Sequence, residues 1–175
     1  MRRQKLWKGL LAGSAAGLAG AFAMTQFQNL WSKGSEKLKS NGNSQGSYGN
    51  SGQGSENQSE DATMKAAGKV AEAAGYELSR KQKKKAGPVV HYAFGAGMGA
   101  LYGSMLELGP RELRRHALLS GIGFGSVLFA GADELAVPAV GLSQKPGDKH
   151  IYALASHIVY GVTAGAVLQA VRRTL

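Results

Sequence analysis

Four long stretches of the chain contain no charged residue, and charged or polar segments separate them. They comprise residues 9–32, 86–106, 116–132 and 150–171. A helix needs about 20 mainly apolar residues to cross a hydrocarbon core roughly 30 Å thick. The third stretch reaches that length if its helix continues through Asp133 and Glu134 into the apolar run 135–142. The pattern therefore predicts an all-α, polytopic membrane protein with four transmembrane helices.

The same pattern gives boundaries for each segment. We expect a basic amino terminus with transmembrane helix 1 in 1–33, a disordered Gly/Ser/Asn linker in 34–60, a short amphipathic helix followed by a basic juxtamembrane run in 61–85, transmembrane helix 2 in 86–106, a short loop in 107–116, transmembrane helix 3 with the acidic pair and a break at Pro138 in 117–142, a loop in 143–149, and transmembrane helix 4 with the basic carboxyl terminus in 150–175. Asp61 has the side chain of a helix N-cap.

The first stretch has a second interpretation. A basic start, an apolar run and Ala21-Phe22-Ala23 also resemble a cleaved signal peptide. The apolar run continues well past Ala23, however, and Trp7 and Trp31 bracket it as interfacial anchors do. These two features favour a membrane span.

Glycines recur at steps of four residues in all four stretches. The positions are Gly9, Gly13 and Gly17, then Gly95, Gly99 and Gly103, then Gly121 and Gly125, and finally Gly161 and Gly165. Small residues at this spacing form a strip on which two helices approach closely. The spacing predicts a glycine-rich bundle, and it would also suit association with a second copy or with a partner membrane protein.

A short motif occurs twice. His91-x-x-Phe94-Gly95 and His157-x-x-Tyr160-Gly161 are each followed by a second glycine and an alanine at the same distance. The second and fourth helices then resemble copies of one another, and the chain would consist of two tandem helical hairpins related as a parallel repeat.

Polar residues inside the predicted spans are candidates for function, because burying them in a membrane is costly. The set consists of Gln26, His91, Asp133, Glu134 and His157. Both histidines precede a glycine of the predicted strips by four residues, so they should face the bundle. We expect one polar cluster, for which three interpretations stay open: a hydrogen-bond network that fixes helix register, a proton or pH-sensing site, and a divalent metal site.

The charge distribution bears on partners and orientation. The net charge is +10, and its densest basic run consists of Arg80, Lys81, Lys83, Lys84 and Lys85. That run is either a solvated anchor at the lipid headgroups or a specific anionic-lipid site. The basic amino terminus favours cytoplasmic termini, whereas the run itself argues for the opposite orientation.

Several classes of function lack support. The chain has no cysteine, so disulfides and thiolate chemistry are excluded. No nucleophile, phosphate-loop or metalloprotease motif occurs, and no soluble domain presents the basic residues to nucleic acid. We therefore expect no enzymatic activity, no cofactor and no bound metal, with the lipid bilayer as the main partner.

Three segments also resemble a known family. They are 86–95 (AGPVVHYAFG), 131–138 (GADELAVP) and 155–161 (ASHIVYG), and they are similar to the YagU-type family of bacterial inner-membrane proteins, a domain of unknown function. The resemblance covers the last three predicted spans well, the first moderately, and the linker not at all. It implies an inner-membrane location and an association with acid resistance or envelope stress. A small-solute transporter or channel component, and a scaffold that docks a partner protein, are the alternative functions.

Overall fold

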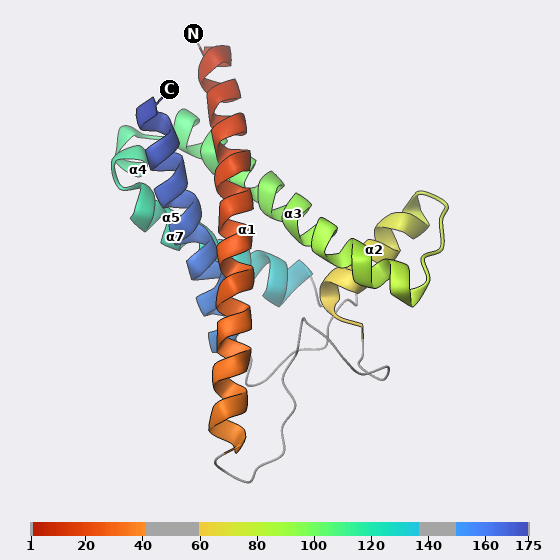
Figure 1. Cartoon of the computed structure of the whole chain (residues 1–175). Helices are drawn as coiled ribbons and strands as arrows, with labels where there is room; N and C mark the ends of the chain where they lie inside the picture. Colours follow the sequence, from red (N-terminus) through yellow and green to blue (C-terminus); the bar gives the residue numbers. More distant parts are fainter. Residues whose placement is uncertain (1, 41–59, 137–149, 175) are drawn as a thin grey trace.

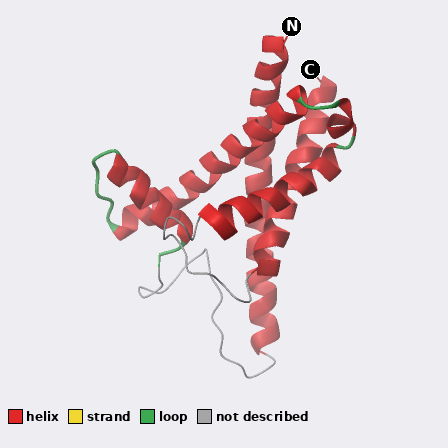
Figure 2. Ribbon diagram, turned by 180° about the vertical axis from the view of Figure 1, so that it is seen from behind, coloured by secondary structure: helices red, strands yellow, loops and turns green. Residues whose placement is uncertain are grey.

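The computed structural model describes residues 2–40, 60–136 and 150–174, and every element in these ranges is helical. The elements are α1 (Arg2–Ser40), α2 (Ala62–Ala73), α3 (Arg80–Leu108), α4 (Arg111–Arg115), α5 (Ala117–Leu128), the π-helix η1 (Phe129–Ala136) and α7 (His150–Thr174) (Figure 1). No strand occurs within the described ranges (Figure 2). The all-α class predicted from the uncharged stretches is confirmed.

Two of these helices are long and apolar enough to cross a membrane, judged by length and composition. They are Leu6–Ser35 within α1 and Ile151–Thr174 within α7, and a shorter apolar helical stretch covers Ala117–Ala132. The helix α1 continues past the predicted boundary at residue 33 to Ser40. The sequence explains the extension, since residues 33–40 contain no proline and a single glycine to interrupt the helix.

The helices form two antiparallel pairs, α1 with α3 and α5 with α7, and α1 also packs along α7. The amino terminus, α4 and the carboxyl terminus lie at the same end of the molecule (Figure 1). The helix α3 crosses α1 obliquely, so that its amino-terminal half and α2 project away from the other helices (Figures 1 and 2).

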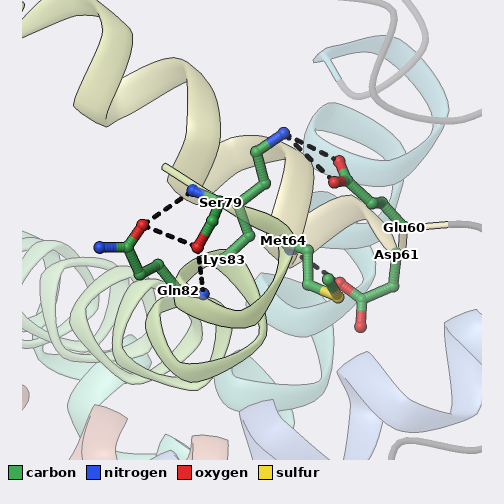
Figure 3. A network of polar contacts seen from close by, with 6 residues as sticks. All are labelled: Glu60, Asp61, Met64, Ser79, Gln82 and Lys83. Carbon is green, nitrogen blue, oxygen red and sulfur yellow. Dashed lines mark hydrogen bonds and ion pairs between the residues drawn. The ribbon is translucent and has the colours of Figure 1, made fainter. Parts of the chain in front are cut away.

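Side-chain caps fix the first turns of both α2 and α3 (Figure 3). The Asp61 carboxylate accepts a hydrogen bond of 2.8 Å from the Met64 amide, which confirms Asp61 as the N-cap of α2. Ser79 and Gln82 form a capping box at the start of α3. The basic run is consequently the first turns of α3, and Lys83 pairs with Glu60 at 3.2 Å.

The structure differs from the prediction in the loop 107–116 and in the third apolar helix. The short helix α4 lies in the segment predicted as a loop, where Glu112 in its first turn and Arg114 and Arg115 in its last suit the helix dipole. The third apolar helix changes from α to π geometry at Phe129. Pro138 and the loop 143–149 lie outside the described residues, as does most of the linker 34–60.

The helices α1 and α3 approach at glycine positions. A Cβ atom on Gly13 would overlap the Gly99 backbone, and one on Gly103 would lie 2.9 Å from the Gly13 Cα. A Cβ atom on Gly95 would lie 2.7 Å from the Cβ of Ala21. No side chain fits between the two backbones at these positions.

The helices α5 and α7 approach in the same way. A Cβ atom on Gly121 would overlap the Gly161 carbonyl oxygen, and one on Gly161 would overlap that of Gly121. Gly125 faces the His157 carbonyl group, and Gly165 faces that of Ala117. By contrast, a Cβ atom on Gly97 or Gly123 would meet nothing within 4 Å, so these glycines face outward.

The two pairs share one register. On α3, Gly95 meets Gly17 and Ala21, and Gly99 meets Gly13. On α7, Gly161 meets Gly121 and Gly125, and Gly165 meets Ala117. Gly13, Gly17 and Ala21 therefore correspond in order to Ala117, Gly121 and Gly125, because the same separation along the chain relates each to its counterpart.

Two tyrosines connect the pairs. The Tyr102 hydroxyl of α3 donates to the Ala117 carbonyl oxygen at 2.6 Å, and its ring stacks on Phe124 with centroids 4.9 Å apart. The Tyr160 hydroxyl of α7 donates to the Gly95 carbonyl oxygen of α3 at 2.7 Å. Both tyrosines are buried, so these hydrogen bonds hold α3 to the second pair inside the bundle.

Candidate functional site

His91 lies on α3 against α1, at the end of the glycine contact that is remote from the termini. Its Nε2 atom is 3.4 Å from Thr25 Oγ1 and 3.5 Å from the Ala21 carbonyl oxygen. The Thr25 hydroxyl donates its proton to Ala21 at 3.0 Å. Thr25 can therefore only accept from the imidazole, which assigns the proton of neutral His91 to Nε2.

His157 lies on α7 and is only 8% exposed. Its Nδ1 atom is 2.9 Å from the Ala153 carbonyl oxygen, one turn earlier in the same helix. Since a carbonyl oxygen only accepts, Nδ1 carries the proton and Nε2 is the basic nitrogen of the neutral ring. The ring also packs against Phe129 with centroids 6.0 Å apart.

The two histidines occupy equivalent places in the two helix pairs. His91 faces Thr25, which is one turn beyond Ala21, and His157 faces Phe129, which is one turn beyond Gly125. The correspondence between the two helix pairs therefore includes the histidines as well as the glycines. The residue that faces the histidine is polar in the first pair and aromatic in the second.

One hydrogen bond connects the two helices that carry these histidines. The Tyr160–Gly95 hydrogen bond lies one turn away from both histidines, and it joins the same two helices.

Not every predicted member of the cluster is brought to this place. Gln26 is exposed, and Thr25 occupies the position facing His91. Thr25 follows Gly13, Gly17 and Ala21 at the same four-residue spacing, so this spacing would have identified Thr25 as the residue that faces His91. Glu134 is half-buried on η1, and the side chain of Asp133 lies outside the described residues.

The acidic pair lies in the π-helix η1. π-Helical turns occur mostly as single insertions within α-helices, frequently at functional sites. Within the described ranges, no group of three or more His, Asp or Glu side chains is arranged to hold a metal ion. The described buried side-chain nitrogen and oxygen atoms all have hydrogen-bond partners, so the interior forms a closed polar network there.

The predicted headgroup residues lie on the first turns of α3. Arg80, Lys81, Lys84 and Lys85 are exposed, whereas Lys83 is half-buried in its ion pair with Glu60. Lys81, Lys84 and Lys85 thus present positive charge on the surface of α3. The predicted strip residues Gly13, Gly17, Gly95 and Gly99, and likewise Gly121, Gly125, Gly161 and Gly165, all lie at the helix contacts described above.

Comparison with known proteins finds no relative of this chain. No protein-family model matches the sequence, and neither a curated protein nor a solved structure is similar to it.

Proposed function

We propose that this chain is a multi-pass protein of the bacterial inner membrane that responds to protons through His91 and His157. One observation carries the proposal: the Tyr160–Gly95 hydrogen bond joins α3 to α7 inside the bundle, one turn away from His91 and from His157. In this proposal four helical segments cross the membrane as two tandem hairpins, and both termini are cytoplasmic. The resemblance to the YagU-type family supports a role in acid or envelope stress.

The outer surface of the bundle supports the membrane location. Leu11 on α1, Val127 on α5 and Ile151 on α7 are 68%, 67% and 78% exposed. Such side chains suit lipid contact better than water. In lipid, van der Waals contact between closely packed backbones replaces the hydrophobic drive for helix association. The glycine contacts of both pairs supply that kind of packing.

The proposed response arises from charge. Protonation of an imidazole adds a positive charge to the ring. Like charges in a medium of low dielectric repel strongly. On α1, the side chain that faces His91 is the neutral Thr25. Protonation therefore weakens the α3–α7 contact at the Tyr160–Gly95 hydrogen bond, and the two helix pairs move relative to each other.

Stability measured against pH tests the proposal. We expect unfolding of the reconstituted protein by sodium dodecyl sulfate to need less detergent at pH 5.0 than at pH 7.5. The difference should vanish in the His91→Gln/His157→Gln variant, because neither glutamine titrates. The variant His116→Gln is the matched control, since His116 is exposed outside the cluster. A pH difference that persists in the double variant, or one that His116→Gln abolishes, contradicts the proposal.

A scaffold is the second candidate, and the closed polar network favours it. In that case the histidines only fix helix register. The double variant would then lose stability equally at both pH values. Proton flux into liposomes separates both candidates from a channel, since a channel would conduct through the histidines and a closed network would not.

A further inference from the structure

A cavity of about 360 Å³ lies at the end of the molecule that carries both termini. Its lining combines positive charge with a few apolar residues. The charged residues are Arg114 and Arg115 of α4 and Arg172 and Arg173 of α7, and the apolar ones include Leu106 and Leu168. The four guanidinium groups come from segments far apart in the sequence, so the basic runs did not predict this site.

Two of the four arginines are held in place by the fold. Arg172 pairs with Glu107 of α3 at 2.8 Å. Arg114 donates to the carbonyl oxygens of Leu106 and Glu107, each at 3.2 Å, and so caps the end of α3. These contacts orient the walls of the cavity, and among the described residues the Glu107 carboxylate offsets one of the four positive charges.

The other two arginines are not held in this way. Arg115 and Arg173 make no hydrogen bond or ion pair with another residue in the described ranges, and both are exposed. Arginine binds phosphate oxygens in a bidentate manner. Two such guanidinium groups at one cavity suit a ligand that carries a phosphate group.

We propose that this cavity binds the phosphate group of an anionic phospholipid. Basic pockets between transmembrane helices on the cytoplasmic side are known to bind such headgroups. The inference rests on the membrane location proposed above. It also assigns the lipid to a different end of the molecule from the basic run at Arg80–Lys85.

Native mass spectrometry of the detergent-purified full chain tests the assignment, with phosphatidylglycerol as the probe and phosphatidylcholine as its neutral counterpart. We expect one phosphatidylglycerol to bind, and the Arg115→Gln/Arg173→Gln variant to bind it about tenfold or more weakly. This variant keeps the Arg172–Glu107 pair and the Arg114 cap, so folding should persist. The matched control is Lys81→Gln/Lys84→Gln, which removes two exposed charges from the basic run and should leave binding unchanged.

Three outcomes would overturn the proposal. They are equal binding of phosphatidylcholine, equal weakening by the lysine control, and displacement of the lipid by millimolar inorganic phosphate, which would indicate a site for soluble anions. Insertion into phosphatidylcholine vesicles is measured separately by resistance to carbonate extraction. A protein that inserts but binds no phosphatidylglycerol refutes the lipid site alone, whereas a protein that fails to insert refutes the membrane location.

Discussion

Substitution of Gly99 by alanine tests the contact between α1 and α3 where three backbone atoms of α1 lie close to the added Cβ. The added Cβ would lie 2.6 Å from the Gly17 amide nitrogen, and closer still to the Gly17 Cα and the Gly13 carbonyl oxygen. Ordinary contact between such atoms needs about 3.5 to 4.0 Å. The two backbones must therefore separate by about 1 Å. Overpacking of this kind costs about 1–3 kcal/mol, which is a roughly 5- to 150-fold change in the folding equilibrium.

The assay is unfolding of the reconstituted protein by sodium dodecyl sulfate, followed by tryptophan fluorescence. Both tryptophans of the chain, Trp7 and Trp31, lie on α1, so the signal reports on that helix. The variant Gly97→Ala is the control: it lies on the same helix, but its Cβ would meet nothing within 4 Å. We expect the control to be neutral or stabilised by up to about 1 kcal/mol, because alanine favours helix more than glycine does. Equal midpoints for the two variants would refute the reasoning.

The remaining predictions use the same assay on the second pair and on the connection between the pairs. Gly161→Ala should destabilise the fold by a similar amount, because its Cβ would overlap the Gly121 carbonyl oxygen, whereas Gly123→Ala should not; similar midpoints for these two variants would contradict the α5–α7 contact. Tyr160→Phe removes the 2.7 Å hydrogen bond to Gly95 and should cost about 0.5–1.5 kcal/mol. A Tyr160→Phe variant as stable as the parent would show that this hydrogen bond does not hold the pairs together.

Much of the fold follows from local features of the sequence. Uncharged stretches predict where the long helices lie, and Asp61 marks the start of α2 by its side chain alone. The glycine steps place the residues that come to lie at the helix contacts, since residues four apart share a face. The repeated histidine motif identifies the two positions that are equivalent in the structure.

Other features depend on tertiary arrangement and are not visible in any one segment. The arginine cavity joins α4 to α7, whose sequences are separated by α5 and η1. The change to π geometry at Phe129 has no proline or glycine pair that marks it. Gln26 is exposed because of the way α1 is rotated about its own axis. The position of an uncharged stretch in the sequence does not determine that rotation.

The central claim is that protonation of the histidine pair moves α3 relative to α7, and a distance measurement tests it most directly. The chain has no cysteine, so spin labels can be attached to cysteines introduced at Val89 on α3 and Ile151 on α7, both of which are exposed. In phosphatidylcholine vesicles, we predict that double electron–electron resonance gives a longer label separation at pH 5.0 than at pH 7.5, and that His91→Gln/His157→Gln abolishes the change. A separation that is the same at both pH values, or a change that survives in the double variant, would contradict the account.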